Sequence, residues 1–507
     1  MTDASTSPPE RTGARISTGV PGLDDVLSGG LTPSRLYLLE GTPGTGKTTL
    51  ALQFLREGVA LGERALYVTL SETTDELCAA AATHGWDLGG IDVYELVDEA
   101  GLDPDSEQSI LHPSEIELGE TVKDVIARVD RTKPDRVVFD SLSELRLLAQ
   151  NPLRYRRQIL ALKRFFAKRA CTVLMLDDKT SETGDVQLHS IAHGVISLEQ
   201  ATREYGSERR RLRIVKMRGI KFRGGYHDFV LETGGIQVFP RLIAAEHHAR
   251  FDPQGKSTGS AELDLLLGGG LVPGTNTLLL GPSGVGKTTT AIRCMLAALE
   301  RGERATYYLF DEGLATLLTR SAMLGMDLAP HIEAGRLTVT QIDPAELSPG
   351  EFSSLARQAV EERKASFVVV DSLNAYLHAM PGEDFLILQM HELLSYLNQQ
   401  GVTTLLVLGQ HGVVGEVRTD VDLSYLSDCI LLFRFFEASG AVRTALSVVK
   451  SRVNAHERTI REMKLSTGGI QVGEALTDFE GVLTGLPAYR GKVAMLTSQG
   501  PTASEVR

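Results

Sequence analysis

Two segments of the chain combine glycines, a lysine and a threonine in the order G-x-x-x-x-G-K-T, 240 residues apart. Glycines at this spacing let backbone N–H groups turn towards a phosphate, the lysine reaches the outer phosphates, and the threonine hydroxyl can ligate Mg²⁺. The sequence therefore predicts two sites for ATP. Their residues are Gly41, Thr42, Pro43, Gly44, Thr45, Gly46, Lys47 and Thr48, then Gly281, Pro282, Ser283, Gly284, Val285, Gly286, Lys287 and Thr288.

One aspartate in each half ends an apolar run: Asp140 follows Arg-Val-Val-Phe and Asp371 follows Phe-Val-Val-Val. A carboxylate at the carboxyl end of a buried strand, beside a phosphate loop, can hold magnesium through water. The alternative is that each aspartate only caps the helix that follows. Because the position recurs, we expect a magnesium site in each half, formed with Thr48 and Thr288.

Hydrolysis also needs a base that orients the attacking group. Glu72 and Glu312 follow the second apolar run of each half, and Asp311 precedes Glu312. We expect these three carboxylates at the same sheet edge as the phosphate loops, with a catalytic role. The alternative is that they are solvated surface residues.

The elements needed to position these residues are a strand before each loop and a helix after it. Apolar runs at 36–39 and 277–280 precede the loops, and apolar residues at helical spacing follow at 50–55 and 292–299. A helix N-terminus at the loop favours a bound anion, because its free N–H groups and its dipole face the phosphate.

The duplication covers nearly the whole chain. Gly62-Glu-Arg-Ala recurs at Gly302, and Thr233-Gly-Gly-Ile-Gln-Val recurs at Thr467. The offset falls from 240 residues at the loops to 231 at Asp140 and Asp371, so the first copy carries extra residues, which we place around 98–120. A repeat of this length indicates two copies of a domain and not a solenoid.

Within each copy, apolar runs alternate with helical segments, which predicts an α/β fold with a mainly parallel sheet covered by helices on both faces. Shorter segments at 212–216, 229–232 and 236–239 are expected to add antiparallel strands at one edge. The expected parallel strands are 65–70, 136–139 and 172–176 in the first copy and 305–310, 367–370 and 403–408 in the second.

Composition narrows the class of protein. The 507 residues are 42% hydrophobic and 23% charged, which is typical of a globular protein, and four scattered cysteines indicate neither a disulfide framework nor a zinc site. With no apolar run long enough for a bilayer and no secretory signal, we expect a cytoplasmic protein and no membrane partner. The net charge of −13 makes a nucleic-acid partner unexpected, although residues 203–223 hold nine basic residues against two glutamates.

Three features carry a resemblance to a known family: the tandem loops, the Ser17-Thr-Gly and Gly29-Gly-Leu lead-in, and the segment Lys216-Met-Arg-Gly. Together they resemble the KaiC family of clock ATPases and autokinases, over roughly residues 15–485. The resemblance implies two tandem RecA-like P-loop NTPase domains, Mg²⁺-dependent ATP hydrolysis and a homohexamer with ATP between neighbouring subunits. The domain boundaries we expect are a flexible N-terminus at 1–14, the first domain at 15–247, the second at 248–485, and a tail at 486–507.

The same resemblance implies roles for particular residues. Lys216 and Arg218, and Lys450 and Arg452 in the second domain, would act in trans on the triphosphate of an adjacent subunit. The second domain would phosphorylate itself at Ser424. The chain departs from the family where Ser71 and Asp311 replace the first of two glutamates, where Lys450-Ser-Arg452-Val replaces Lys-Met-Arg-Gly, and where Tyr425 replaces a threonine.

Two other functions use the same core. One is a RecA-like DNA-binding ATPase, such as a recombinase mediator or a helicase-like motor, which needs basic loops and could use only residues 203–223. The other is a signalling scaffold whose nucleotide state controls binding of a protein partner. A role in signalling or timing is expected for either enzyme or scaffold.

Overall fold

The computed structural model describes residues 15–96, 113–149, 151–179, 186–202, 205–378, 385–410, 424–438, 440–467, 469–484 and 488–489. The chain divides into two units, Met1–Arg241 with Ser348–Ser354, and Leu242–Leu347 with Leu355–Arg507. The expected flexible N-terminus at 1–14 and nearly all of the expected tail at 486–507 lie outside the described residues.

Among the described residues of the first unit, nine strands form one sheet in the order β3-β2-β4-β5-β1-β6-β7-β8-β9. Neighbouring strands are parallel from β3 to β6 and antiparallel from β6 to β9. The strands are β1 Leu36–Gly41, β2 Ala65–Thr69, β3 Ile91–Glu95, β4 Arg136–Asp140, β5 Thr172–Asp178, β6 Gly194–Ala201, β7 Arg209–Met217, β8 Tyr226–Glu232 and β9 Gly235–Phe239.

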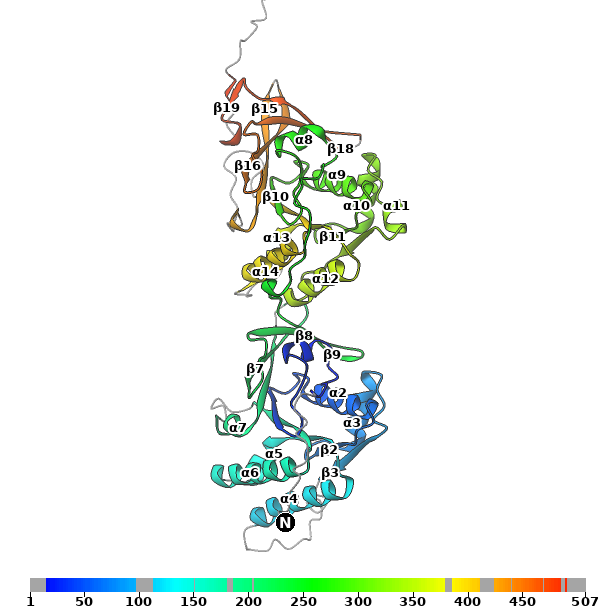
Figure 1. Ribbon diagram of the computed structural model, residues 1–507, viewed down its shortest axis with the longest axis vertical. Helices are drawn as coiled ribbons and strands as arrows, with labels where there is room; N and C mark the ends of the chain where they lie inside the picture. Colours follow the sequence, from blue (N-terminus) through cyan, green and yellow to red (C-terminus); the bar gives the residue numbers. More distant parts are fainter. Residues whose placement is uncertain are drawn as a thin grey trace, which may run out of the picture. The chain divides into compact units, whose positions relative to one another are not determined.

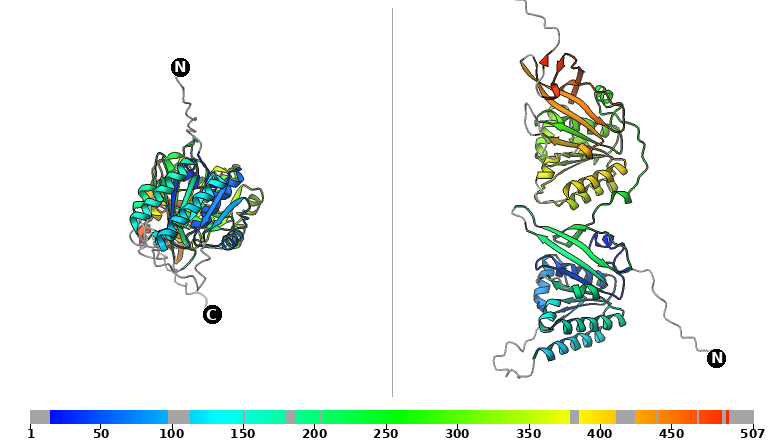
Figure 2. Two further views of the ribbon diagram at one scale, coloured as in Figure 1. Left: turned by 90° about the horizontal axis from the view of Figure 1, so that it is seen from below. Right: turned by 90° about the vertical axis from the view of Figure 1, so that its left-hand side faces the viewer.

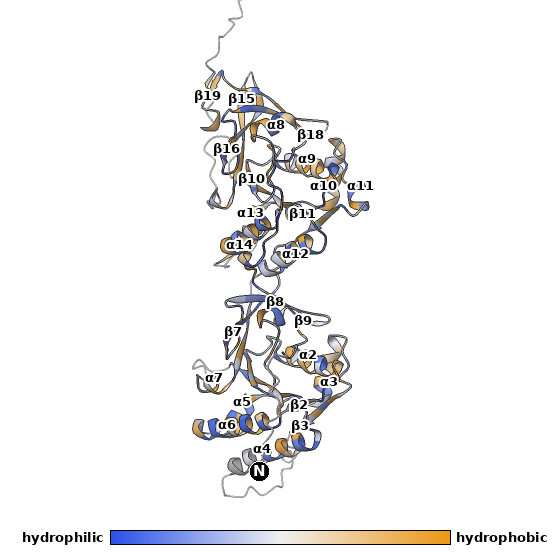
Figure 3. Ribbon diagram, viewed as in Figure 1, coloured by the Kyte–Doolittle hydropathy of each residue, from blue (hydrophilic) through white to orange (hydrophobic). Residues whose placement is uncertain are grey.

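Helices cover both faces of this sheet (Figures 1 and 2). Side chains alternate along β1, so Tyr37 and Leu39 join the core under α2 while Leu36 and Leu38 join the core under α5 and α6. Both faces of the central strands are therefore apolar. Figure 3 colours each residue of the ribbon by its hydropathy. The helices are α1 Leu23–Val26, α2 Lys47–Ala60, α3 Thr74–Thr83, α4 Pro113–Thr132, α5 Leu142–Ala149, α6 Pro152–Lys168 and α7 Val186–Ile191.

The second unit repeats this architecture, with the sheet order β12-β11-β13-β14-β10-β15-β16-β17-β18 among its described residues. Its strands are β10 Asn276–Gly281, β11 Ala305–Leu309, β12 Leu337–Gln341, β13 Phe367–Asp371, β14 Thr403–Gly409, β15 Cys429–Ala438, β16 Ala441–Ser451, β17 Arg461–Ser466 and β18 Gly469–Ala475, followed by the pair β19 Phe479–Glu480 and β20 Ala488–Tyr489. Its helices are α8 Ala261–Leu266, α9 Lys287–Glu300, α10 Leu314–Met323, α11 Ala329–Glu333, α12 Pro349–Glu361, α13 Leu373–His378 and α14 Leu386–Gln399, with 3-10 turns η2 Ala244–Glu246, η3 Ser424–Leu426 and η4 Val482–Thr484.

The predicted α/β class, the parallel core and the antiparallel edge are confirmed. The strands β4, β5, β13 and β14 run one or two residues past their predicted ends, because the ladder continues through the polar residues at the carboxyl edge of the sheet. Sequence analysis did not identify the outer strands β3 and β12. Their side chains are only half-buried, so the apolar signal is weak.

Three other expectations bear on the described residues. All four cysteines are free. The described ranges contain no group of three or more His, Cys, Asp or Glu side chains that could hold a metal ion. None of the described helices combines the length and the apolar character that a membrane span requires. Residues 98–112 of the expected insertion lie outside the described residues, and α4 after them has 20 residues where α12 has 13.

Candidate nucleotide sites

Each phosphate loop connects a buried strand to a helix, as predicted. In the first repeat β1 ends at Gly41 and α2 begins at Lys47, and the residue before the helix, Gly46, has φ 98°. Gly286 precedes α9 with φ 100°. Only glycine adopts this left-handed backbone without strain, so the loop turns sharply and leaves the helix N–H groups open to an anion.

The loop lysine is buried in both repeats. Lys287 Nζ donates to the carbonyls of Gly281 at 2.8 Å and Pro282 at 2.7 Å, and burial lowers its pKa to about 8 against the opposing charge of Asp371. In the first repeat Lys47 Nζ donates to the carbonyl of Gly41 at 2.9 Å. Each ammonium group therefore already lies inside the loop that would surround the phosphates.

The predicted magnesium residues meet in both repeats. Thr288 Oγ1 donates to Asp371 Oδ2 at 2.7 Å, and Thr48 Oγ1 lies 3.5 Å from Asp140 Oδ2. Both carboxylates are buried, and burial raises the pKa of each. A hydroxyl beside a buried carboxylate at a phosphate loop is a set of hard oxygen ligands that suits Mg²⁺ and its retained waters. The magnesium role itself stays a prediction.

A tyrosine that sequence analysis missed supports each aspartate. Tyr67 OH donates to Asp140 Oδ2 at 2.5 Å, and Tyr307 OH donates to Asp371 Oδ2 at 2.6 Å. These hydrogen bonds oppose the effect of burial on the aspartate pKa values. The available signal was the recurrence of the two tyrosines at the offset of the loops, within matching strands.

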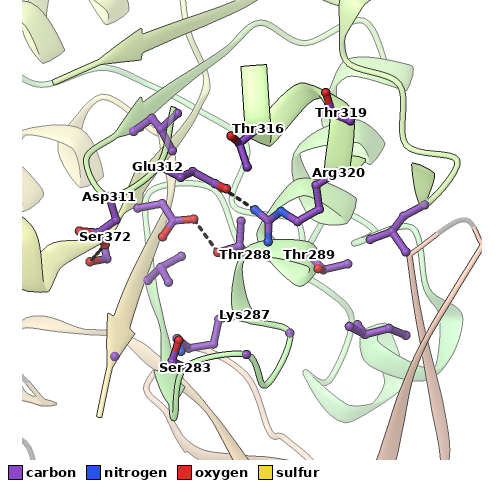
Figure 4. Close-up of a pocket in the computed structure, with 18 of the residues that line it drawn as sticks. Ser283, Lys287, Thr288, Thr289, Asp311, Glu312, Thr316, Thr319, Arg320 and Ser372 are labelled. Carbon is purple, nitrogen blue, oxygen red and sulfur yellow. Dashed lines mark hydrogen bonds and ion pairs between the residues drawn. The ribbon is translucent and has the colours of Figure 1, made fainter. Parts of the chain in front are cut away.

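The carboxylates of the second repeat are held by specific partners. Glu312 forms an ion pair with Arg320 of α10, and Ser372 Oγ donates to Asp311 (Figure 4). Burial raises the pKa of Glu312, while the charge of Arg320 opposes that rise and the charge of Asp371 adds to it. Arg320 was not anticipated from the sequence.

Glu72 of the first repeat has different surroundings. It is half-buried, and burial raises its pKa, with further increases from the charges of Asp140, Glu76 and Asp178. Helix α3 carries Ala80 at the position that Arg320 has in α10. The first repeat therefore lacks this cation next to its glutamate.

A pocket of about 900 Å³ lies over the second loop. Its polar side consists of loop residues with Asp311, Glu312 and Asp371, and Figure 4 shows Lys287, Thr288 and Arg320 around one space. Thr316, Thr319, Arg320 and Ser372 add further polar groups, and the rest of the lining is largely apolar and suits a nucleobase, because a ligand pocket combines an apolar wall with a few fixed polar groups. The apolar lining includes Leu309, Ala315, Met323, Leu324, Val407 and Leu465.

The residues expected to act in trans are bonded to backbone carbonyls. Lys216 Nζ donates to His189 O and, at 2.9 Å, to Ala192 O, and Arg218 donates to Ser190 O at 2.7 Å. Burial lowers the pKa of Lys216, as do the positive charges of Arg218 and Lys163. Lys216, Arg218 and Lys163 form a group of positive charges that is complementary to a phosphate group.

The second repeat repeats this arrangement at η3. Lys450 Nζ donates to Ser427 O at 2.6 Å, and Arg452 donates to Tyr425 O at 3.4 Å and lies 3.5 Å from Asp428. Neither cation is among the residues that line the pocket of the same repeat. The predicted phosphosite Ser424 is the first residue of η3, and residues 411–423 before it lie outside the described residues.

Among the described residues of the basic run, 205–223, three arginines have partners. Arg210 lies 2.7 Å from Glu208, Arg213 lies 3.6 Å from Glu199, and Arg211 stacks over Tyr226 at 5.0 Å. A surface that binds a nucleic-acid backbone needs positive charge available to phosphates. These contacts reduce the support for the DNA-binding alternative.

Comparisons with known proteins agree with this geometry. The family described as "ATPase: KaiC" matches residues 16–243 and 256–477. The circadian clock oscillator protein KaiC of Acaryochloris marina is 27% identical over 93% of this chain and 91% of its own length. The circadian clock protein KaiC3 of Synechocystis sp. is 27% identical over 94% of this chain and 95% of its own length. The Synechococcus elongatus KaiC is 26% identical over 94% of this chain and 92% of its own length.

Proposed function

The chain belongs to the KaiC family of ATPases, and from this we propose that it is a Mg²⁺-dependent ATPase that works as a ring of six copies. The observation that supports this best is the meeting of loop lysine, threonine hydroxyl and buried aspartate in both repeats. Phosphoryl transfer relies on positioning and on charge stabilisation, and these groups supply both.

In the proposed reaction a water oxygen attacks the γ-phosphorus of ATP and the bond to the β–γ bridging oxygen breaks, which leaves ADP. Glu72 or Glu312 takes the proton of that water, and a pKa raised by burial makes each carboxylate a better base at neutral pH. Mg²⁺, held by Thr48 with Asp140 or by Thr288 with Asp371, would neutralise charge on the phosphate oxygens. The loop lysines bind the same oxygens.

The variants Glu72→Gln and Glu312→Gln test whether these two glutamates act as the catalytic bases. Each should lower hydrolysis by its own repeat about a hundredfold, because the amide cannot accept the proton. Binding of ATP, measured by equilibrium dialysis, should persist. A double variant with undiminished turnover would reject both assignments and would favour a scaffold in which hydrolysis is dispensable.

The cations that the family resemblance assigns a role in trans support the proposed ring. Lys216 and Arg218, and Lys450 with Arg452, have carbonyl partners in their own repeat and would reach the γ-phosphate of a neighbouring copy. An arginine lent in this way contributes about a thousandfold or more to turnover.

Sedimentation of the purified chain tests the assembly. We expect hexamers with ATP and Mg²⁺, and Arg218→Ala or Arg452→Ala should lower turnover while ATP still binds. Arg213→Ala is the matched control, because Arg213 lies on β7 with Lys216 but pairs with Glu199. A monomer that hydrolyses ATP at the full rate would reject the ring.

We also propose that the second repeat phosphorylates Ser424. The hydroxyl oxygen would attack the γ-phosphorus, ADP would leave, and Glu312 would take the proton. The argument is the place of Ser424 in η3, a turn that Arg452 contacts at Tyr425 O, that Lys450 approaches at the following Ser427 O, and that the resemblance identifies with a phosphosite.

Intact-mass analysis after incubation with ATP tests this activity. One phosphate should appear in the peptide 419–428, and Ser424→Ala should remove it. Tyr425→Phe is the matched control, because a phosphate lost with that variant belongs to the tyrosine. Unchanged mass after long incubation would leave an ATPase without autokinase activity.

A further inference from the structure

The two loop lysines differ in one contact. Lys47 Nζ forms an ion pair with Asp178 Oδ1 at 2.6 Å, with 8% of the Lys47 side chain and 29% of the Asp178 side chain exposed. Because Lys47 is buried and Asp178 is only partly exposed, water and salt screen this ion pair less than they screen a surface pair. In the first repeat the Asp178 carboxylate is therefore already bound to the ammonium group that would bind the phosphates of ATP.

The second repeat has no side chain at the matching position. Asp178 is the last residue of β5 and lies opposite Gly41 in the parallel ladder. Gly409 is the last residue of β14 and lies opposite Gly281 in the same register. At this ladder position the repeats therefore differ by one residue, aspartate against glycine, next to equivalent loops.

The position of Asp178 is fixed by helix α5. Ser143 Oγ donates to Asp178 Oδ2 at 3.2 Å, and Arg146 pairs with the preceding Asp177 at 2.9 Å. Asn374 occupies the place of Ser143 in the second repeat, where its amide bonds both backbone groups of Gly409. Contacts with α5 that do not involve the phosphate loop therefore anchor the end of β5.

We propose that Asp178 is an intramolecular competitor of ATP at the first repeat. Without nucleotide it holds Lys47, and the phosphates must displace it. Once they have done so, its negative charge stays close to theirs and repels them. This inference rests on the role of the loop in ATP binding and deepens it: the first repeat exchanges nucleotide readily, while the second retains it.

The test measures the dissociation constant of a fluorescent ATP analogue with the full chain. Lys287→Ala silences the second loop, so that binding reports the first. In that background Asp178→Asn keeps the shape and removes the charge, and we expect the dissociation constant to fall about tenfold, with slower release. An unchanged or weaker dissociation constant would overturn the proposal and make Asp178 a residue that orients Lys47.

The reciprocal experiment adds the charge to the second repeat. In a Lys47→Ala background, Gly409→Asp should weaken binding about tenfold relative to Gly409→Asn. The asparagine variant controls for crowding, because a Cβ at Gly409 would lie 3.3 Å from Asn374 Oδ1. Equal affinities in the two variants would also overturn the proposal.

The role of the loop is checked in the same assay. Lys47→Ala combined with Lys287→Ala should abolish binding. If it does while Asp178→Asn has no effect, the competitor is rejected and the nucleotide site stands. If the double variant binds normally, the proposed function fails instead.

Discussion

The two repeats share their loops, their aspartates and their tyrosines, and they differ in which group of the site has a charged partner. In the first, Lys47 is paired with Asp178 and Glu72 has Ala80 where an arginine could stand. In the second, Glu312 is paired with Arg320. Duplication preserved the parts that we propose to hold phosphate and magnesium, while the contacts that restrain those parts diverged.

This difference indicates that two repeats with the same motifs need not bind and hydrolyse ATP at equal rates. A paired lysine weakens nucleotide binding, and a paired glutamate is a weaker base because the nearby positive charge favours its ionised form. We therefore expect the first repeat to turn over ATP faster and the second to keep it longer. Four experiments can break or sharpen this contrast.

The largest effect should come from the loop lysines. Lys47→Ala or Lys287→Ala removes the cation that faces the outer phosphates, and each should lower hydrolysis by its own repeat about a thousandfold. Because Glu72 is the unrestrained base, Lys47→Ala should remove most of the steady-state phosphate release and Lys287→Ala little of it. Sedimentation of both variants controls for assembly. An equal loss from the two would contradict the contrast.

The next effect concerns Arg136, which is buried and pairs with Glu63 while donating to Phe54 O at 2.8 Å. Phe367 stands at this ladder position in the second repeat. Arg136→Ala breaks a buried ion pair and should lower the unfolding free energy of the first repeat by about 3 kcal/mol.

Urea unfolding followed by fluorescence measures this loss. Trp86 is the single tryptophan of the chain and lies in the first repeat, so its emission reports that repeat. Arg136→Met should cost less than the alanine variant, because it keeps most of the buried volume. A methionine variant as unstable as the alanine one would show that the charge, and not the packing, stabilises the site.

A smaller effect concerns His227, whose pKa burial lowers to about 4. The folded repeat keeps the imidazole neutral, with Nδ1 accepting from Arg241 N at 2.8 Å. In the unfolded chain the imidazole binds a proton near pH 6.5. The stability that comes from keeping it neutral is therefore complete above pH 6.5 and is lost as the pH falls towards 4. Between pH 7 and pH 5 the first repeat should lose about 2 kcal/mol.

Urea unfolding followed by Trp86 fluorescence at pH 7 and pH 5 measures this loss of stability. The variant His227→Gln should remove most of the pH dependence. The second repeat has Arg461 at the start of β17, matching the region of His227 in β8, and an arginine keeps its charge throughout this range. A pH dependence that survives in the glutamine variant would assign the effect to other groups.

The smallest effect concerns how the rate of ATP hydrolysis by the second repeat falls at acid pH. Arg320 opposes the rise in the pKa of Glu312, so Arg320→Gln should raise that pKa further and move the acid limb of second-repeat hydrolysis to higher pH. Measured in a Lys47→Ala background, the variant should approach the profile of the first repeat. Thr319→Ala, a neighbouring pocket residue on α10, is the control. A drop in rate without a shift would make Arg320 a phosphate ligand.

Sequence alone predicted the α/β class, the duplication and the meeting of Thr288 with Asp371, because glycine spacing and the ends of apolar runs are local signals. It missed Tyr67 and Tyr307, because a tyrosine in a strand reads as core until its hydroxyl is seen to reach a carboxylate.

Asp178 and Arg320 were missed for a different reason. Each is a charged residue one side chain away from a predicted site residue, but on another strand or helix, and no spacing in the chain encodes that approach. Asp178 does lie two residues after the predicted strand 172–176, but this position does not reveal its contact with Lys47. The trans roles of Arg218 and Arg452 need an assembly to be tested.

The carbonyl contacts of Lys216 and Arg218 have a consequence for communication in the proposed ring. To extend towards a neighbour, these cations must release Ala192 and Ser190, and each hydrogen bond to a charged group costs about 1.5–3 kcal/mol to give up. In the proposed ring a triphosphate in the adjoining subunit would offset that cost. An empty neighbour would leave the cations retracted and an occupied one would draw them out, so we expect each subunit to sense whether its neighbour has bound nucleotide.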